Sequence, residues 1–205
     1  MMSTDLREHS PAAERNSGPI LAELLRRLPR TGVMLEIASG TGQHAAHFSA
    51  ALPGWRWIAS DSDARALLSI RAWCADIKNV SDALPLDVMQ PFWAGVPNQV
   101  DTIFNANMLH ISPWPTCAAL MRGAARHMSA QGQLLLYGPF LEEGETTAPS
   151  NLDFDADLRA RDPAWGIRRL ADVEDQAAAV GLKLKERVPM PANNLLVILT
   201  RRTSA

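Results

Sequence analysis

Apolar residues recur along the chain at two spacings, one typical of helices and one typical of buried strands. Residues 20–28 carry apolar side chains three and four positions apart, which predicts an amphipathic helix that opens at Gly18-Pro19 and ends at Pro29. The uninterrupted apolar run 33–37 predicts a buried strand. The same reasoning predicts strands at 55–59, 83–86, 100–104 and 134–137, and helices at 43–51, after a capping Asp63, and from Pro113 and Pro115 to Met128.

This alternation ends in the C-terminal third of the chain. Residues 138–166 form a long polar connection, and connections of this length in a compact domain are usually functional or disordered. A helix at 170–180, stopped by Gly181, and strands at 182–188 and 195–200 are predicted after it. A short turn joins these two strands, so we expect an antiparallel pair at the edge of the sheet.

Length and periodicity together define the domain organisation. Strands that alternate with helices imply parallel pairing, with helices on both faces of the sheet. Residues 1–16 have little periodicity and are expected to form an N-terminal arm. A chain of 205 residues suits one domain, so we expect a single α/β domain over residues 1–205.

Composition and charge narrow the classes of partner. The formal net charge is -2, so no global basic field attracts nucleic acid or an acidic membrane. Cys74 and Cys117 belong to no C-x-x-C pair, which argues against a zinc ribbon or a disulfide framework. The polar N-terminus does not fit a signal peptide, and no stretch is long and apolar enough to span a bilayer. These features predict a cytoplasmic protein.

The strongest local signal is the segment 36–42, Glu-Ile-Ala-Ser-Gly-Thr-Gly. A predicted strand leads into a turn with two glycines, and a predicted helix leaves it. Glycine permits positive φ and lets a ligand approach the backbone, and the helix N-terminus offers free N–H groups. Open α/β sheets bind ligands at the carboxyl ends of their strands, so this turn is the predicted ligand site.

Three kinds of ligand compete for this turn. Gly40, Gly42 and Ala45 satisfy the loose dinucleotide pattern G-x-G-x-x-A, with Asp61 following at a suitable distance. A phosphate loop is excluded, because no Gly-Lys-Ser or Gly-Lys-Thr follows. Glu36 favours a cation, since a buried acid repels a pyrophosphate but suits the positive amino and sulfonium groups of S-adenosylmethionine. Alternatively, Glu36 only accepts hydrogen bonds from loop amides.

Polar residues at the ends of the next strands extend the predicted site. Asp61 can accept both ribose hydroxyls, or it can serve as a helix cap. Asp87 can accept the adenine amine, or it is an ordinary turn aspartate. The backbone of residues 105–107 ends the fourth predicted strand and is expected to face the methionine end of the cofactor.

In sum, the chain resembles class I S-adenosylmethionine-dependent methyltransferases. More narrowly, it is similar to a poorly characterised bacterial and eukaryotic family known as a domain of unknown function, or as "methyltransferase-like". The resemblance runs from Glu14 to the end of the chain, and its most specific motifs are S-N-x-x-F-D from Ser150, L-R-x-R-D-P-x-W-G-I-R from Leu158 and M-P-x-N-N from Met190.

The resemblance implies a fold, a cofactor and a set of binding residues. It implies a Rossmann-like sheet of seven strands, mostly parallel with a C-terminal antiparallel strand, and S-adenosyl-L-methionine as cofactor. Residues of the turn and of the matching stretches are then expected to bind it: Glu36, Ser39, Gly40, Thr41, Gly42, His44, Asp61, Ser62, Asp87, Val88, Asn105 and Asn107.

Two residues are candidates for catalysis, and a metal is not expected. His44 and His47 have a spacing that can bind a metal, but no third ligand is near in sequence, so His44 is assigned to the cofactor loop. His110 follows the fourth strand and can deprotonate a nucleophile, or it is a hydrogen-bonded structural histidine. Tyr137 ends the fifth strand and can orient the substrate or the sulfonium, or it is a core tyrosine.

The long connection 138–166 and the N-terminal arm are expected to close a substrate pocket. In the family interpretation the polar residues of the connection form a cap over that pocket, and the alternative is an ion-pair lattice that only folds the loop. The candidate substrate residues are Arg15, Asn16, Asn151, Asp155, Arg159, Trp165 and Asn193.

The sequence therefore predicts in-line methyl transfer to a small-molecule acceptor, with no nucleic acid or membrane partner and an undetermined oligomeric state. Two alternatives stay open. One is a nicotinamide-dependent oxidoreductase, supported only by the glycine pattern. The other is a non-catalytic S-adenosylmethionine-binding protein on the same scaffold.

Overall fold

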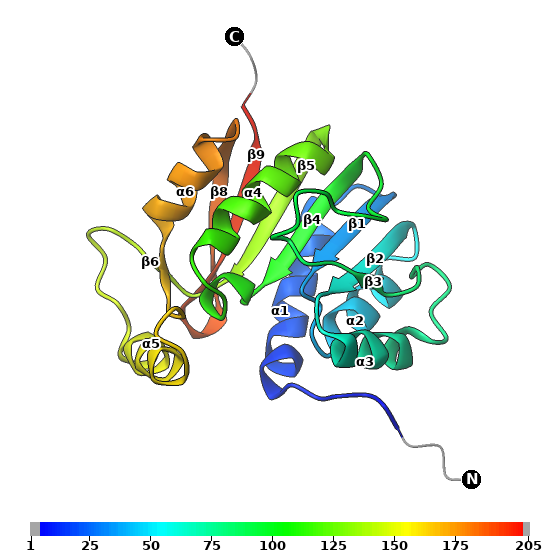
Figure 1. Ribbon diagram of the computed structural model, residues 1–205, viewed down its shortest axis with the longest axis horizontal. Helices are drawn as coiled ribbons and strands as arrows, with labels where there is room; N and C mark the ends of the chain where they lie inside the picture. Colours follow the sequence, from blue (N-terminus) through cyan, green and yellow to red (C-terminus); the bar gives the residue numbers. More distant parts are fainter. Residues whose placement is uncertain (1–4, 203–205) are drawn as a thin grey trace.

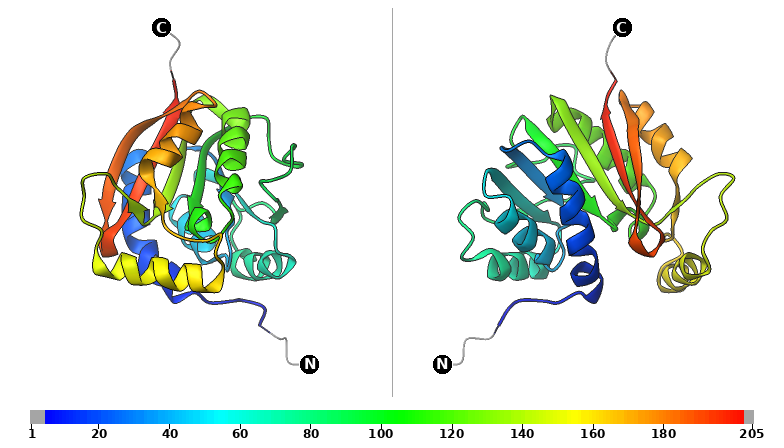
Figure 2. Two further views of the ribbon diagram at one scale, coloured as in Figure 1. Left: turned by 60° about the vertical axis from the view of Figure 1, so that its left-hand side comes forward. Right: turned by 180° about the vertical axis from the view of Figure 1, so that it is seen from behind.

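The computed structural model describes residues 5–202 and shows a central sheet between two layers of helices (Figures 1 and 2). Apolar runs of valine, leucine and isoleucine form the inner strands, as expected for strands covered on both faces. The seven strands of the sheet are β1 (Gly32–Ile37), β2 (Trp55–Asp61), β3 (Leu84–Pro85), β4 (Val100–Ala106), β5 (Met128–Gly138), β8 (Leu182–Met190) and β9 (Asn194–Arg201).

The strand order of the sheet is β3-β2-β1-β4-β5-β9-β8. Strand β1 pairs in parallel with β2 and β4, and β4 pairs in parallel with β5. Strand β9 runs antiparallel to both β5 and β8. The predicted fold class, a seven-stranded, mostly parallel sheet with a C-terminal antiparallel strand, is confirmed.

The core has two layers, one on each face of the sheet, and each layer is covered by its own set of helices. Helices α1 (Pro11–Arg27), α2 (Gln43–Ala51) and α3 (Ala64–Cys74) cover one face of the sheet and are seen from the front in the right view of Figure 2. Helices α4 (Pro115–His127) and α6 (Leu170–Ala178) cover the other face. Helix α5 (Pro149–Arg161) lies beyond the strand ends, at the lower left of Figure 1.

The first helix begins earlier than the sequence predicted. Helix α1 starts at Pro11 instead of Gly18, and the Oγ atom of Ser10 caps it by accepting a hydrogen bond from the Ala13 amide at 3.3 Å. Pro19 therefore lies inside the helix, and Pro11 occupies the first turn that was assigned to it. The predicted arm 1–16 shortens accordingly to the residues before Pro11, of which 1–4 lie outside the described part.

The predicted connection 138–166 is also not a structureless loop. It contains β6 (Phe140–Leu141), which pairs with β7 (Arg168–Arg169), and it contains α5. Asn151 and Leu158 are the buried residues of α5, so this helix has no apolar stripe that a sequence pattern could reveal. The fifth strand also begins before its predicted start, at Met128.

This topology gathers the predicted site at one edge of the sheet. The carboxyl ends of β1, β2, β4 and β5 share an edge, and β9 begins at the same edge. Strands β2 and β3 follow β1 in the chain and lie on one side of it, whereas β4 and β5 lie on its other side, so the strand order reverses at β1. Such a reversal of strand order is where open α/β sheets bind ligands.

Candidate functional site

The glycine turn after β1 combines strained backbone with open space. Gly40 and Gly42 have φ values of +57° and +86°, and Ala38 before them has +53°. A Cβ atom added at Gly42 lies 2.7 Å from the Ile70 Cα atom of α3, whereas one added at Gly40 meets no atom within 4 Å. Packing of α2 against α3 therefore requires Gly42, and Gly40 faces free volume beside the turn.

Asp61 ties the end of β2 to this turn. Its Oδ2 atom accepts a hydrogen bond from the Gly40 amide at 2.9 Å, and its Oδ1 atom accepts one from the Asp63 amide at 3.0 Å. Helix α3 is capped by Asp63, whose Oδ1 atom accepts from the Arg65 amide at 2.8 Å. The carboxylate of Asp61 is therefore not the helix cap and lies at the first glycine of the turn.

Glu36 lies under the turn rather than at its surface. Its side chain is 2% exposed, and its Oε2 atom accepts a hydrogen bond from the Trp57 Nε1 atom at 2.7 Å. Burial raises the pKa of Glu36 to about 8, against the opposing hydrogen bonds from Trp57 and Ser39. The carboxyl group is therefore mostly protonated at pH 7 and supports the turn from inside the core. Glu36 thus does not provide the negative charge for a cation that its position in the sequence predicted.

The segment before α1 frames the turn from outside. The Glu8 amide donates to the Ser69 Oγ atom at 2.8 Å, and that hydroxyl donates to the Thr41 carbonyl at 2.6 Å. The Ser10 amide donates to the Gln43 Oε1 atom at 2.5 Å. The N-terminal segment is thus fixed beside the turn and α3, below α3 in Figure 1.

His44 is buried between α2 and α1. Its Nε2 atom lies 3.2 Å from the Ala13 carbonyl, and its ring stacks on Phe48 with the centroids 5.0 Å apart. Burial lowers the pKa of His44 to about 4, so the ring is neutral at physiological pH. Its predicted place beside the cofactor loop is compatible with this position, because His44 follows Gln43 at the start of α2.

The end of β4 supplies two asparagines to the same edge. Asn105 is 1% exposed, and its Nδ2 atom donates to the Ile37 carbonyl at 2.9 Å. Asn107 adopts a φ of +63° and leads into a short 3-10 helix, η1 (Met108–His110). Asn105 therefore holds β4 to the end of β1, and Asn107 turns the chain toward His110.

His110 lies behind the end of β5 and is 1% exposed. A Cβ atom added at Gly138 lies only 2.5 Å from its Nε2 atom, and the Phe140 ring packs edge-on at 5.1 Å. Its buried Nδ1 atom has no hydrogen-bond partner among residues 5–202. Burial lowers the pKa of His110 to about 3, so the imidazole is neutral and a weak proton acceptor.

Tyr137 is buried on the opposite face of the sheet, beside α1. It is 2% exposed, and burial raises the pKa of its hydroxyl to about 12, against a hydrogen bond from Asn194 and the charge of Arg15. The fold thus brings Tyr137 close to Arg15, one of the predicted substrate residues, on an exposed position of α1. Asn16, the next residue, is half-buried.

The residues predicted to contact ribose and adenine differ in exposure. Ser62 and Asp87 are exposed, and Val88 is buried at 6%. The Oδ1 atom of Asp87 accepts a hydrogen bond from the Met89 amide at 2.9 Å, which is the geometry of an aspartate turn. The side-chain Nε2 atom of Gln90 donates to the Oδ2 atom of Asp87 at 3.3 Å, and the exposed carboxylate keeps free lone pairs for a further donor.

Two of the three specific motifs meet across the edge of the sheet. The Nδ2 atom of Asn151 in α5 donates to the Asn193 carbonyl at 3.1 Å. The Nδ2 atom of Asn193 in turn lies 3.4 Å from the Ser150 Oγ atom. Helix α5 is thereby attached to the turn between β8 and β9, which contains the 3-10 helix η2 (Pro191–Asn193).

The remaining substrate candidates form a local lattice. Asp155 accepts hydrogen bonds from the Arg159 Nε atom at 2.8 Å and from the Ile167 amide at 2.7 Å. Burial acts to raise the pKa of Asp155, but these hydrogen bonds outweigh it and leave the pKa below its usual value. Trp165 is half-buried and packs under the Arg161 guanidinium at 5.1 Å. These contacts order this segment locally.

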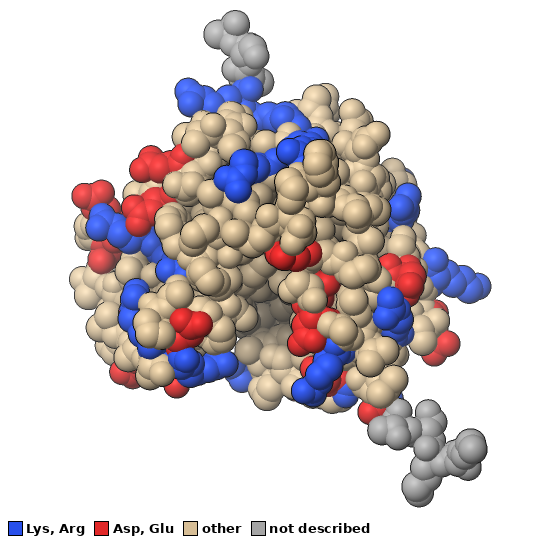
Figure 3. All heavy atoms as spheres, in the orientation of Figure 1, with Lys and Arg blue, Asp and Glu red and all other residues tan. Residues whose placement is uncertain are grey.

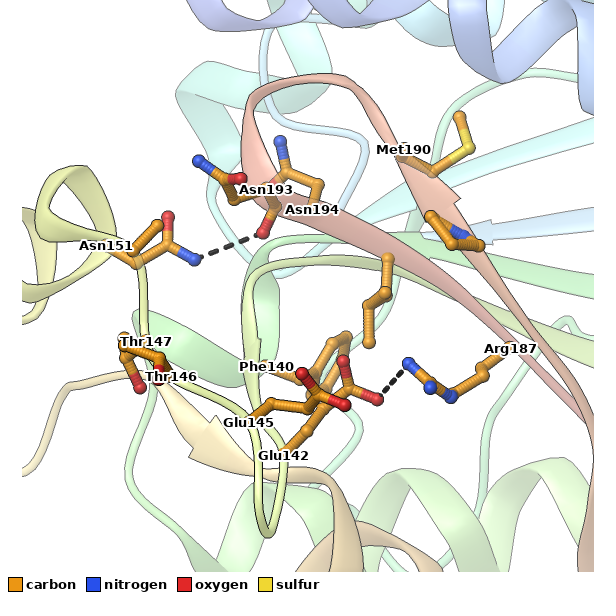
Figure 4. A pocket seen from close by; sticks show the side chains of 13 residues that line it. Phe140, Glu142, Glu145, Thr146, Thr147, Asn151, Arg187, Met190, Asn193 and Asn194 are labelled. Carbon is orange, nitrogen blue, oxygen red and sulfur yellow. Dashed lines mark hydrogen bonds and ion pairs between the residues drawn. The ribbon is translucent and has the colours of Figure 1, made fainter.

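A cavity of about 320 Å³ lies between residues 140–151 and the β8–β9 turn (Figure 4). Asn151 and Asn193 line it, together with residues that sequence reasoning missed, above all Glu142 and Arg187, which form an ion pair across it. These two residues occupy unremarkable polar positions 45 residues apart, so no sequence signal connects them. In the space-filling view the surface is hollowed at this edge, between the regions of α5 and α3 (Figure 3).

Two classes of site receive no support from the described residues. Within residues 5–202 no three histidine, cysteine, aspartate or glutamate side chains are grouped so as to hold a metal ion. Over the same residues, no helix has the length and apolar character needed to cross a membrane.

The sheet order and the glycine turn define the class I methyltransferase fold. The chain belongs to the family described as "Protein of unknown function (DUF938)", whose model matches residues 7–201.

Solved structures with this fold are similar over most of the chain. Mitomycin 7-O-methyltransferase is 18% identical with a TM-score of 0.79, over 93% of this chain and 54% of that one. Human N-acetylserotonin methyltransferase, in complex with S-adenosylmethionine, is 14% identical with a TM-score of 0.77, over 94% and 53%. CalO1, a methyltransferase in calicheamicin biosynthesis in its S-adenosylhomocysteine-bound form, is 19% identical with a TM-score of 0.72, over 89% and 54%. This chain therefore spans about half the length of these proteins.

Proposed function

We propose that this protein is an S-adenosylmethionine-dependent methyltransferase that acts on a small molecule. The observation that carries the proposal is the turn after β1, where Gly40 faces open volume and the Asp61 carboxylate lies 2.9 Å from the Gly40 amide. A carboxylate at that point accepts hydrogen bonds from the hydroxyls of a nucleoside. The turn therefore fits a nucleoside ligand without a phosphate beside the first glycine.

The same geometry argues against a nicotinamide dinucleotide. In dinucleotide sites the glycine turn and the helix N-terminus donate amides to a pyrophosphate. Here the Gly40 amide already donates to Asp61, so it is not free to bind a phosphate. The oxidoreductase alternative depends on the loose glycine pattern. At the first glycine of that pattern, the backbone amide is not available for an anion.

The similar structures support the same choice of ligand. Human N-acetylserotonin methyltransferase was determined with S-adenosylmethionine and CalO1 with S-adenosylhomocysteine. Both share the present fold over most of this chain. At 14% and 19% identity they indicate which ligand to test first rather than which acceptor this protein uses.

When bound, S-adenosylmethionine supplies an activated methyl group, which passes to a nucleophile as the carbon–sulfur bond breaks and its electron pair stays on sulfur. The protein's contribution is to hold the two reactants in line and to exclude water. We assign nucleoside binding to the turn and Asp61, with Asp87 and Val88 beside the adenine. Asn105 and Asn107 are assigned to the methionine end.

His110 and Tyr137 remain the proposed catalytic residues at the far side of the cofactor. Neither can accept a proton at neutral pH, since burial lowers the pKa of His110 to about 3 and keeps the Tyr137 hydroxyl protonated with a pKa of about 12. We therefore propose that they orient the acceptor by hydrogen bonds, and that a proton from the acceptor leaves to solvent. Positioning of this kind fits a pre-activated methyl donor.

The test is a methyl-transfer assay on the full chain. The protein is incubated with S-adenosylmethionine that carries a ¹³C-labelled methyl group and with mixtures of small hydroxyl, thiol and amine compounds. We expect one labelled product, formed in equal amount to S-adenosylhomocysteine. Cofactor binding with no labelled product in any mixture favours the non-catalytic alternative, and the absence of cofactor binding contradicts the proposal itself.

A further inference from the structure

The cavity beside α5 is built from two segments that hold each other in place. One wall is the segment from Phe140 to Asn151, and the other is the end of β8 with the β8–β9 turn. The Asn151–Asn193 hydrogen bond and the Glu142–Arg187 ion pair join the two walls, as the dashed lines in Figure 4 show. The cavity is therefore a defined space at the same sheet edge as the glycine turn.

Three asparagine side chains line the cavity, and each is held by a hydrogen bond from its Nδ2 atom. The Nδ2 atom of Asn151 donates to the Asn193 carbonyl, and that of Asn194 donates to the Pro191 carbonyl at 3.0 Å. The Nδ2 atom of Asn193 lies 3.4 Å from the Ser150 hydroxyl. Each of these amide nitrogens keeps a second N–H and each amide oxygen keeps a free lone pair, so the three side chains can both donate to and accept from a ligand.

The charged side chains of the cavity indicate which charge its ligand carries. Its charged lining residues are two carboxylates, Glu142 and Glu145, and one guanidinium, Arg187. Glu142 already pairs with Arg187, and Glu145 makes no ion pair among residues 5–202. In Figure 4 both carboxylates lie together near Phe140, facing Arg187. The cavity therefore has a net negative charge that a cation can balance.

The rest of the lining is apolar. Phe140, Met190 and Leu195 contribute aromatic and aliphatic side chains to the cavity. A volume of about 320 Å³ is at the lower limit of the range for small-molecule sites. A compact apolar body therefore fits beside the carboxylates.

We propose that this cavity binds a small organic ammonium compound, in which a protonated amine is attached to a compact apolar body. The amine contacts Glu142 and Glu145 and donates to the amide oxygens. Resting on the proposed function, this compound is the methyl acceptor: Phe140 lines the cavity and packs against His110, so the apolar body lies next to that proposed orienting residue. Because an ammonium group held by carboxylates keeps its proton and has no free lone pair, the methyl group goes to a different atom of the compound.

The test uses matched probes that differ in charge. One series is tyramine, 4-ethylphenol and 4-hydroxyphenylacetate, and the other is hexylamine, hexanol and hexanoate. Calorimetric titration at pH 7 measures their affinities for the full chain, with and without saturating S-adenosylhomocysteine. We expect the amine in each series to bind at least about 10-fold more tightly than the carboxylate, a difference of about 1.4 kcal/mol.

The double variant Glu142→Gln/Glu145→Gln tests the proposed contacts. Removal of both carboxylates leaves Arg187 unpaired in the cavity, so we expect the preference to reverse in favour of the carboxylate probes. Glu143→Gln is the matched control, because Glu143 is exposed on the same loop and does not line the cavity. The melting temperature of each variant shows that it is folded.

Three results overturn the inference: tightest binding of the carboxylate probes, no amine binding at millimolar concentration, or an unchanged preference in the double variant. Titration with S-adenosylhomocysteine separates this outcome from failure of the proposed function. If S-adenosylhomocysteine binds and the amines do not, only the inference fails. If the amines bind in a Glu142- and Glu145-dependent manner and S-adenosylhomocysteine does not, only the proposed function fails.

Discussion

The two ends of the ligand-binding edge are built in different ways. At Gly40 itself the contacts are backbone hydrogen bonds and one carboxylate, and they come from a short stretch of the chain, residues 36–63. Around Glu142 and Arg187 the site consists of side chains from two remote segments. A backbone cradle suits a ligand that does not change, whereas side chains on loops are free to set the choice of acceptor. The first end is therefore the proposed cofactor site and the second the proposed acceptor site.

The largest effect is expected from Gly40→Leu. A leucine side chain at this position projects into the open volume beside the turn, so we expect loss of S-adenosylhomocysteine affinity by about 100-fold or more, measured by calorimetry. Gly181→Leu is the matched control, since Gly181 has a φ of +79°, an equally open surrounding and a position at the end of α6. Both variants bear the same backbone strain, of about 1–2 kcal/mol. Equal cofactor affinity in the two variants contradicts the assignment of the turn.

The next largest effect is a loss of cofactor affinity that we expect on substitution of Asp61 but not of Asp63. Asp61→Ala removes the carboxylate beside the Gly40 amide, and we expect cofactor affinity to fall about 10-fold or more. Asp63→Ala removes only the cap of α3, which costs about 1 kcal/mol of stability and leaves cofactor affinity unchanged. Thermal unfolding and titration of both variants measure the two quantities. If both variants lose cofactor affinity to a similar extent, the loss comes from destabilisation of α3 and not from a missing contact between Asp61 and the cofactor.

A change at His110 tests the catalytic side of the edge. We expect His110→Ala to lower turnover about 10- to 100-fold through loss of acceptor orientation, with little change in cofactor affinity. Because burial holds the pKa of His110 at about 3, the wild-type rate should show no histidine inflection between pH 5 and 9. His127→Ala is the control, since His127 is buried as well and bonds to the Pro97 carbonyl at the end of α4. Equal turnover in the two variants removes His110 from the mechanism.

The smallest effect concerns Glu36 and appears as a pH dependence of stability. Burial holds the pKa of Glu36 at about 8 in the fold, above the usual glutamate value of 4.5. Its contribution to stability is therefore present in full below about pH 4.5 and is lost as the pH rises through about 8. Glu36→Gln keeps an acceptor for Trp57 and should gain in stability relative to wild type between pH 5 and 9, by on the order of a few kcal/mol at most. Parallel stability curves for the two proteins exclude a titrating Glu36.

Local patterns predicted most of the fold and the first end of the site. The helix at 43–51 and the cap at Asp63 agree with the structure, because glycine and capping residues act on their own neighbours. The start of α1 was predicted at Gly18-Pro19 instead of Pro11, because both Pro11 and Pro19 suit the first turn of a helix. Helix α5 was missed, because a helix at the rim of the sheet buries too few residues to be periodic.

The second end of the site had no local signal. Asn151 and Asn193 were singled out from the resemblance, and the fold does join them. Glu142 and Arg187 were not found, since only the folded chain brings the start of the 140–151 segment against β8. Residues whose pairing depends on tertiary structure alone cannot be read from periodicity.

The most direct test of the central claim is a pair of calorimetric titrations of the wild-type chain at pH 7, one with S-adenosylhomocysteine and one with NADH. Because the Gly40 amide is already bonded to Asp61 and is not free for a pyrophosphate, we expect binding of one S-adenosylhomocysteine per chain and no binding of NADH. Tight binding of NADH that Gly40→Leu abolishes, with no heat from S-adenosylhomocysteine, is the result that contradicts this account.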